Sequence, residues 1–262
     1  AKPGCFQHPG VLYSGKVHIV DISIPEIWPE RLSAKEADDE TSINISTPFT
    51  YLLTAEFVSE LIPERPPDAH KGSSGHLLTV CGSSGMGGAA SLSSTAALKS
   101  GAGLVSACVP GQLRDNLPGQ VAEVMTVSPH NSSEYFSEED TDFVVQLASE
   151  RNAVVLGCGL GVHSQTAAFV QYLTKHLQGP LLIDADGLNN LDDATLQERL
   201  GTAVITPHPR ELSRLCGQSV TEIQQNRIAT VRRLAQEWNV VLLLKGAYTV
   251  IGSPDGQIFI NP

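Results

Sequence analysis

Residues 70–110 read HKGSSGHLLTVCGSSGMGGAASLSSTAALKSGAGLVSACVP, and this stretch indicates an α/β fold. A strand is predicted over His76–Gly82, followed by the loop SSGMGG and by a helix over Ala89–Lys99 that Gly101 closes as a C-terminal cap. Glycines let a backbone approach a ligand closely, and the N-terminus of a helix presents N–H donors to an anion. The stretch therefore predicts a strand–loop–helix–strand unit whose glycine loop could contact a phosphate.

From residue 76 onward, predicted strands and helices alternate, and several strands are apolar on both faces, as in a sheet covered by helices on both sides. The predicted strands are 76–82, 104–109, 123–128, 153–158, 180–185, 203–206 and 240–245, and the predicted helices are 88–100, 139–149, 164–177, 209–216 and 221–238. Tyr248–Gly252 and Gln257–Ile260 flank the turn SPDG and predict a C-terminal hairpin. The pattern indicates an α/β layered fold with a mainly parallel sheet, in which ligands bind at the carboxyl ends of the strands.

The composition is that of a globular protein: 262 residues, 41% hydrophobic and 17% charged, with a net charge of −11. The acidic balance argues against a nucleic-acid surface, because no basic stripe is present to contact phosphates. No apolar stretch approaches the roughly 20 residues that span a bilayer, so no membrane partner is expected. The five cysteines are read as buried thiols of a reducing compartment, and a cytoplasmic location is expected.

The N-terminal part differs from the rest of the chain. One alternating strand is predicted over Lys16–Ile22, and the polar residues 26–49 predict a surface connection. An amphipathic piece over Thr50–Leu61 precedes the proline-rich PERPPDAHKG, where regular structure is not expected. The predicted organisation is therefore a short segment 1–25, a connection 26–49 and one main domain from residue 50 to residue 262.

Two later loops follow buried strands and carry glycines or carboxylates. GCGLG at 157–161 predicts either a ligand contact or a tight structural turn, and we favour the ligand. LLIDADGLNNL at 181–191 ends a strand with Asp184 and Asp186, two residues apart and hence on one face. These carboxylates could hold a metal, take a proton or cap the following helix.

Two further strand ends carry a histidine and a lysine. In TPHP, prolines on both sides fix His208, which favours a substrate contact over a surface histidine; the role of Glu211 could be limited to the helix dipole. In VVLLLKG, Lys245 and Gly246 follow a buried strand, which favours a phosphate contact over a lysine that simply reaches solvent from the core. Since the carboxyl ends of parallel strands meet at one edge, a small anionic ligand with a nucleotide-like body is predicted there.

Together, the strings HKGSSGHLLTVCGSSGMGGAA, SGAGLV, GCGLG, LLIDADGLNNL, TPHPRE and LLKGAYTVI resemble the NAD(P)H-hydrate dehydratase family, the C-terminal domain of bifunctional NAD(P)H-hydrate repair enzymes. The resemblance runs from Arg65 to Pro262 in the family's order, and it implies a ribokinase-like fold. Residues 1–24 look like the final strand of the partner epimerase domain. The resemblance therefore implies a chain fused to or paired with an epimerase domain, and a homotetramer.

The implied reaction is the ADP-dependent dehydration of the S epimer of hydrated NADH or NADPH, which returns NAD(P)H, AMP and phosphate. In this family, a phosphoryl group from ADP or ATP is placed on the poorly leaving hydroxyl, and its elimination restores the dihydronicotinamide. The epimerase-like tail favours ADP over ATP. The protein's part would be positioning and charge stabilisation around the phosphates, with Mg²⁺ as an implied cofactor.

The resemblance also implies residue roles, which we carry over position by position. Ala89, Gly161 and His208 would contact the hydrated cofactor, so the loop SSGMGG would line the nicotinamide side instead of cradling the nucleotide's phosphates. The nucleotide would be lined by Lys245, Gly246, Ala247, Tyr248 and Thr249. Asp184 and Asp186 would give support.

The family pattern continues after its last strand into a G-[ST]-G-D segment that carries the catalytic Asp, whereas this sequence stops at Asn261-Pro262. The catalytic Asp is therefore expected beyond Pro262, and the 262 residues alone would then be inactive. Two alternatives stay open: a small-molecule kinase of the ribokinase superfamily acting on a vitamin precursor, and a nucleotide-binding module without catalysis.

Overall fold

The computed structural model describes Lys16 and residues 49–130 and 134–262. The strand predicted over Lys16–Ile22 and the connection predicted over residues 26–49 lie outside the described residues, apart from Lys16 and Phe49. The described residues form a ten-stranded sheet with helices, in the order expected for the layered α/β fold.

The elements alternate along the chain from residue 76, as the sequence predicts. The strands are β1 (Thr50–Leu52), β2 (His76–Val80), β3 (Leu104–Cys108), β4 (Met125–Val127), β5 (Ala153–Leu156), β6 (Leu181–Ile183), β7 (Ala203–Ile205), β8 (Val240–Leu244), β9 (Thr249–Gly252) and β10 (Ile258–Asn261). The helices are α1 (Ala55–Leu61), α2 (Gly87–Lys99), α3 (Gly111–Arg114), the 3₁₀ turn η4 (Glu138–Asp140), α4 (Thr141–Ser149), α5 (Ser164–His176), α6 (Asp186–Asn189), α7 (Asp193–Gln197), α8 (Pro209–Cys216), α9 (Val220–Gln225) and α10 (Arg227–Glu237).

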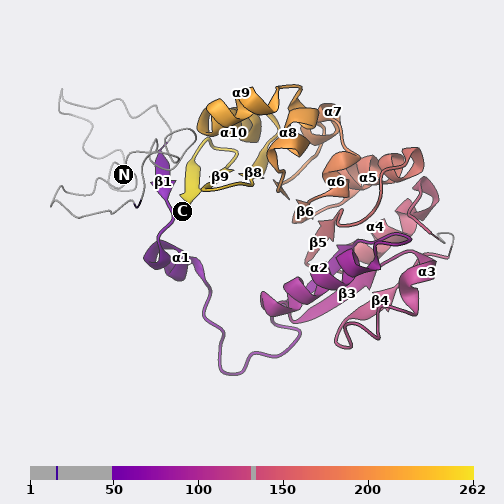
Figure 1. Ribbon diagram of the computed structural model, residues 1–262. Helices are drawn as coiled ribbons and strands as arrows, with labels where there is room; N and C mark the ends of the chain where they lie inside the picture. Colours follow the sequence, from indigo (N-terminus) through magenta and orange to yellow (C-terminus); the bar gives the residue numbers. More distant parts are fainter. Residues whose placement is uncertain (1–15, 17–48, 131–133) are drawn as a thin grey trace, which may run out of the picture.

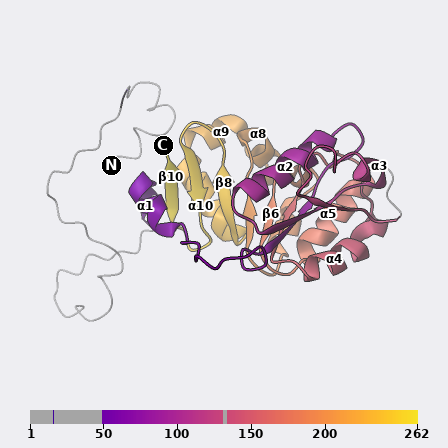
Figure 2. The ribbon, with the colours of Figure 1, turned by 90° about the horizontal axis from the view of Figure 1, so that it is seen from below.

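The strand order is β1-β10-β9-β8-β7-β6-β5-β2-β3-β4. Neighbours from β8 to β4 are parallel, and β9 alone runs antiparallel to both of its neighbours, which makes the predicted C-terminal hairpin. Figure 2 shows α1 and β10 at one end of the sheet, with α3 and α4 at the other. The parallel strands β2, β5, β6, β7 and β8 are adjacent, so their carboxyl ends lie along one edge.

One predicted helix and one amphipathic segment are each divided in the structure. The helix predicted over 221–238 is divided into α9 and α10 at Asn226, whose φ of −133° and ψ of 42° are not helical. The asparagine side chain competes for backbone hydrogen bonds, which disfavours it inside helices. The amphipathic piece Thr50–Leu61 also divides: β1 pairs with β10, and Thr54 then caps α1 by accepting from the Phe57 N–H at 3.2 Å. The short helices α3, α6 and α7 were not predicted, since each has at most five residues.

One face of the sheet carries the larger core. Alternate residues of the central strands are buried there, among them Leu78, Ile183, Ile205 and Leu242. Figure 1 shows α5, α8 and α10 along the outer side of the curved sheet, and their apolar side chains belong to this same cluster. The alternation of buried and half-buried residues along β8 follows from the two-residue period of a strand.

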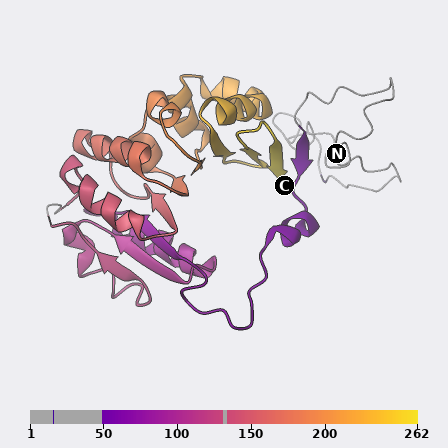
Figure 3. The same cartoon turned by 180° about the vertical axis from the view of Figure 1, so that it is seen from behind.

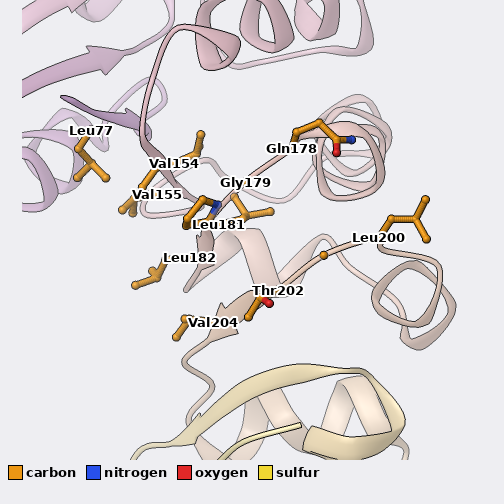
Figure 4. Close-up of a pocket in the computed structure, with 13 residues that line it drawn as sticks. Leu77, Val154, Val155, Gln178, Gly179, Leu181, Leu182, Leu200, Thr202 and Val204 are labelled. Carbon is orange, nitrogen blue, oxygen red and sulfur yellow. The ribbon is translucent and has the colours of Figure 1, made fainter. Parts of the chain in front are cut away.

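The other face is covered less completely in the described part of the chain. There α2 and α3 pack over β2 and β3 in a smaller cluster that includes Ala90 and Val105. Beside it lies an apolar groove of about 540 Å³, and Figure 4 shows Val155, Leu182 and Val204 lining it. The groove extends to the loops that precede β6 and β7, so it lies away from the carboxyl ends of the strands.

Residues 62–75 run from α1 back to β2 without helix or strand, as the proline-rich composition predicts. Figure 3 follows this segment between the two ends of the molecule. Among the described residues, no helix has both the length and the apolar character needed to cross a bilayer.

Candidate functional site

Five loops meet at the carboxyl edge of the sheet, after β2, β5, β6, β7 and β8. Backbone hydrogen bonds join each loop to a neighbouring strand or loop: Gly82 N to Cys158 O (2.8 Å), Asp184 N to Leu156 O (3.1 Å), Thr206 N to Ile183 O (3.3 Å) and Lys245 N to Pro207 O (2.9 Å). Because these bonds continue the sheet ladder beyond the strands, the loops are held in one row. Every residue that the sequence predicts for the site lies on this row, at the start of α2 or at the start of β9.

The loop GCGLG packs directly on its neighbours. Gly157 has φ +133°, and a Cβ added there would lie 2.0 Å from the Asp184 carbonyl oxygen. Gly159 has φ +71°, and its added Cβ would lie 2.6 Å from the Ala89 Cβ. Close packing therefore requires glycine at both positions, as expected if this part of the motif is a tight structural turn. The third glycine, Gly161, lies close to the start of α2.

Asp186 holds Gly161 in place. Its Oδ2 accepts from the Gly161 N–H at 3.0 Å, and its Oδ1 accepts from Asn189 Nδ2 at 3.1 Å. Asn190 completes the network by donating from Nδ2 to the Gly161 carbonyl at 2.8 Å. Both carboxylate oxygens of Asp186 thus accept hydrogen bonds from the protein itself, and one of these bonds holds the loop that carries Gly161.

The expectation that Asp184 and Asp186 share one strand face is wrong. β6 ends at Ile183, and Ala185 turns the chain with φ +51° and ψ −122°, a backbone conformation that residues with a Cβ rarely adopt. As a result Asp186 turns to Gly161, whereas Asp184 pairs with Lys245: the Lys245 Nζ donates to Asp184 Oδ1 at 2.6 Å.

Lys245 is the cation at this edge. Its side chain is 40% exposed and that of Asp184 is 25% exposed, so the ammonium reaches solvent at the loop row. A partly exposed ion pair of this kind contributes about 0–1 kcal/mol to stability. The lysine can therefore exchange its carboxylate partner for another anion at little cost. Thr249 closes the turn that follows by donating from Oγ1 to the Gly246 carbonyl at 3.1 Å.

His208 caps α8 in a reciprocal capping box with Glu211. The His208 Nδ1 accepts from the Glu211 N–H at 3.1 Å, and the Glu211 Oε2 accepts from the His208 N–H at 2.7 Å. Pro209 stands at the first helical position, where its missing N–H is not needed. Nδ1 must carry a lone pair to cap the helix, and Nε2 lies 3.4 Å from Glu211 Oε1, in a side chain that is 49% exposed. Glu211 therefore has a role beyond its favourable interaction with the helix dipole, because its carboxylate also accepts a hydrogen bond from the His208 N–H.

Cys158 is a site residue that sequence reasoning missed. It lies half-buried inside GCGLG, and its thiol is hydrogen-bonded to that of the fully buried Cys81. This hydrogen bond, assisted by Ser93 and by the charge of Lys245, lowers the pKa of Cys158 to about 6 and raises that of Cys81. The sequence did carry one signal for Cys158: it lies between Gly157 and Gly159, two glycines that pack directly against neighbouring loops. The four cysteines that the structure describes are free thiols.

The described residues do not fit a resident Mg²⁺ ion. Within them, no group of three His, Cys, Asp or Glu side chains is placed to hold a metal. Asp184 is engaged by Lys245, and Asp186 by Gly161 and Asn189.

A sequence model of NAD(P)H-hydrate dehydratase matches residues 77–262, which include all five loops. The chain belongs to the NAD(P)H-hydrate dehydratase family. Its family resemblance therefore extends over the whole loop row and the C-terminal hairpin.

Relatives of the same family align with most or all of the chain. The bifunctional NAD(P)H-hydrate repair enzyme of Moorella thermoacetica is 38% identical over 264 residues, covering 100% of this chain and 47% of the relative. The ADP-dependent (S)-NAD(P)H-hydrate dehydratase of Neisseria meningitidis is 35% identical over 217 residues, covering 80% of this chain and 69% of the relative. The chain thus spans about half the length of the bifunctional relatives it matches.

Solved structures confirm the ribokinase-like fold of this NAD(P)H-hydrate dehydratase family member. The ADP/ATP-dependent NAD(P)H-hydrate dehydratase of Bacillus subtilis, co-crystallized with ATP and Mg²⁺, superposes with a TM-score of 0.67 at 28% identity, covering 83% of this chain and 73% of the other. A ribokinase-like superfamily protein of Enterococcus faecalis gives a TM-score of 0.67 at 24% identity, which bears on the fold alone.

Proposed function

We propose that this chain carries the nucleotide-dependent dehydratase function of its family: hydrated NADH or NADPH, as the S epimer, reacts with ADP to give NAD(P)H, AMP and phosphate. The observation that carries the proposal is the row of five loops, in which the Lys245 ammonium and the Gly161 loop lie at the same carboxyl edge. Its support is the family membership and the Neisseria meningitidis relative, whose name states ADP dependence and the S epimer.

In this proposal the nucleotide lies against Lys245–Thr249. The Lys245 ammonium leaves Asp184 for a phosphate oxygen, and Asp184 remains beside it as the group that orients it. Once it has moved to the nucleotide, this ammonium stabilises the negative charge of the transferring phosphoryl group, which lowers the barrier. Mg²⁺ would enter with the nucleotide, whose phosphates would supply the ligands that the described residues lack.

The hydrated nicotinamide lies at the Ala89–Gly161 end of the row, with His208 between the two ligands. Gly161 is held by Asp186 and Asn190, so its backbone does not reorganise on binding. The Nε2 of His208 would turn from Glu211 Oε1, 3.4 Å away, to the substrate hydroxyl, because Nδ1 is used by the helix cap.

The wider organisation is also part of the proposal. The bifunctional relatives match along the full length of this chain, which supports a fusion or pairing with an NAD(P)H-hydrate epimerase domain. We further propose a homotetramer and a cytoplasmic location. Size-exclusion chromatography with light scattering tests the tetramer directly.

The test of the proposed function combines binding and turnover. Calorimetry with ADP measures nucleotide binding, and incubation of hydrated NADH with ADP measures the return of NADH by its near-ultraviolet absorbance together with AMP and phosphate release. NADH formation that requires ADP supports the dehydratase. Binding without turnover would favour a nucleotide-binding module, and phosphorylation of a vitamin-precursor alcohol with hydrated NADH untouched would favour a kinase.

A further inference from the structure

Arg227 is a buried cation directly behind the loop that follows β8. It is the first residue of α10 and is 2% exposed. Its Nη2 donates to the Leu244 carbonyl at 3.0 Å and to the Lys245 carbonyl at 3.4 Å, and its Nη1 donates to Gln224 Oε1 at 2.8 Å. No ion pair joins it to an acidic side chain within the described residues, and burial lowers the pKa of its guanidinium.

Gly246 makes room for this guanidinium. A Cβ added to Gly246 would lie 3.1 Å from Arg227 Nη1 and 3.3 Å from Nη2, so a side chain there would press on the cation. The glycine also has φ +142°, which residues with a Cβ rarely adopt. The backbone of the loop at Gly246 therefore packs directly against the guanidinium of Arg227, which is a fixed positive charge.

Arg199 provides a comparison within the same molecule. It is also buried, at 4% exposed, and it donates to the carbonyls of Thr174, Leu177 and Gly179. Those carbonyls lie in and just after the last turn of α5, before β6 and hence away from the carboxyl-edge loops. Both arginines thus donate hydrogen bonds to backbone carbonyl oxygens, but only Arg227 donates to those of Leu244 and Lys245.

We propose that Arg227 is a positioning residue for Lys245–Thr249, which holds the Leu244 and Lys245 carbonyls inward and supplies a second positive charge behind the loop where the nucleotide's phosphates bind. The binding part of this inference rests on the proposed function. Together with the Pro207 carbonyl, which accepts from the Lys245 N–H, and with Asp184, Arg227 restrains Lys245 at three separate points. A buried charge is screened less by water than a surface charge, so it acts on a phosphate beyond contact distance.

The experiment compares Arg227→Met and Arg227→Lys with the matched control Arg199→Met, which also removes a buried arginine from backbone carbonyls. Hydrogen exchange of the peptide covering residues 244–250 reports on the loop without nucleotide, and calorimetry measures ADP and adenosine. Arg227→Met is expected to speed exchange in this peptide and to weaken ADP binding by about tenfold, because the phosphates would lose a buried positive charge and the loop that it holds in place. Adenosine, which lacks phosphates, is expected to bind equally well.

Arg227→Lys keeps the charge but has fewer hydrogen-bond donors, so its exchange rate and its ADP affinity should lie between those of the wild type and of Arg227→Met. If Arg227→Met does not fold, Arg227→Lys is compared with the wild type instead. The inference is overturned if exchange in 244–250 is unchanged in both Arg227 variants, if Arg199→Met alters it equally, or if ADP and adenosine weaken in parallel. A wild-type chain that binds no ADP would instead refute the proposed function, and the exchange comparison would still decide the role of Arg227.

Discussion

At the scale of single residues, the candidate site depends on which partner each polar group has. Lys245 has a partly exposed carboxylate partner, Asp184, whereas Asp186 accepts a hydrogen bond from the backbone of Gly161. Two carboxylates that are two residues apart in the sequence therefore have different roles. Asp184 leaves the lysine available to an incoming anion, and Asp186 stabilises the loop itself.

The lysine can be tested by substitution. Lys245→Met is expected to weaken ADP binding by about tenfold or more, since a charge-assisted hydrogen bond to a phosphate contributes about 1.5–3 kcal/mol. The free energy of unfolding should change by less than about 1 kcal/mol, because the pair with Asp184 is partly exposed.

The matched control for Lys245 is Lys175→Met. Lys175 pairs with Glu198 at the same distance of 2.6 Å and with a similar lysine exposure of 35%, but far from the loop row on α5. Calorimetry and urea unfolding of the two variants separate the effect of the site from that of a lost ion pair. Equal ADP affinity in both variants would contradict the role of Lys245.

Cys158 predicts a pH dependence. Its pKa of about 6 lies below the ordinary thiol value of about 8.5, so the reactive thiolate is present above pH 6 and is lost as the pH falls through that value. Iodoacetamide should modify Cys158 faster at pH 7 than Cys216, as followed by mass spectrometry of the labelled peptides.

Removal of the hydrogen-bond partner tests the cause. Cys81→Ala should raise the pKa of Cys158 and slow its modification at pH 7, because the hydrogen bond between the two thiols is what favours the thiolate. Cys108→Ala removes another buried thiol from the neighbouring strand and should leave the rate unchanged. A pH profile of Cys158 that is the same with and without Cys81 would contradict this account.

At the scale of elements, the junctions between strands and loops decide how the site is built. Gly157, Gly159 and Gly161 all have positive φ values, but they differ in what lies around them. Gly157 lies against the backbone of the next loop and Gly159 against Ala89, which explains why three glycines occur within five residues. The strand β5 can end, turn and touch both neighbours only because these positions carry no side chain.

Gly157→Ala tests this close approach against Gly179→Ala. Gly179, at φ +81°, lies near the left-handed region, where a residue with a Cβ costs about 1–2 kcal/mol, and Gly157, at φ +133°, lies outside it, where the backbone cost is at least as large. At Gly157 the added methyl group would lie 2.0 Å from the Asp184 carbonyl oxygen and would collide with it. At Gly179 no atom lies within 4 Å of the added methyl group. Urea unfolding should therefore show Gly157→Ala to be less stable than Gly179→Ala by about a further 1–3 kcal/mol, and equal losses would count against the packing role.

At the scale of the whole molecule, the two faces of the sheet are unequal. The face under α5, α8 and α10 is closed over buried side chains, while the opposite face over β5, β6 and β7 carries the apolar groove of about 540 Å³. The same strand therefore places its alternate residues in two different environments. β8 shows this with two adjacent leucines, Leu242 and Leu243.

Leu242→Ala and Leu243→Ala make a matched pair, because they remove the same atoms from neighbouring positions. Leu242 is 0% exposed in the larger core cluster, so its loss should cost about 2–5 kcal/mol in the free energy of unfolding. Leu243 is half-buried on the other face, and its loss should cost less than half as much as that of Leu242. Urea unfolding of the two variants measures the difference, and a larger loss for Leu243 would show that this face is covered in solution.

The fold was predictable to the level of its elements. The predicted strands from residue 76 onward agree with β2–β10 to within two residues at each end, because strand period and glycine punctuation are local properties. Of the breaks that sequence reasoning missed, the one at Asn226 has a local cause, the low helix propensity of asparagine, and the one between β1 and α1 depends on a distant segment, because β1 pairs with β10. Local periodicity carries no information on such contacts.

By itself, the sequence determined the alternation of strands and helices from residue 76 onward, with strand ends to within two residues, and its motifs indicated the family. Only the tertiary structure decided that Asp184 pairs with Lys245, 61 residues away, that Asp186 instead binds Gly161, and that Arg227 lies under Gly246. The reason is physical: a strand's pattern records which face is buried, whereas the partner of a side chain depends on which loops the sheet order brings together and how each one turns.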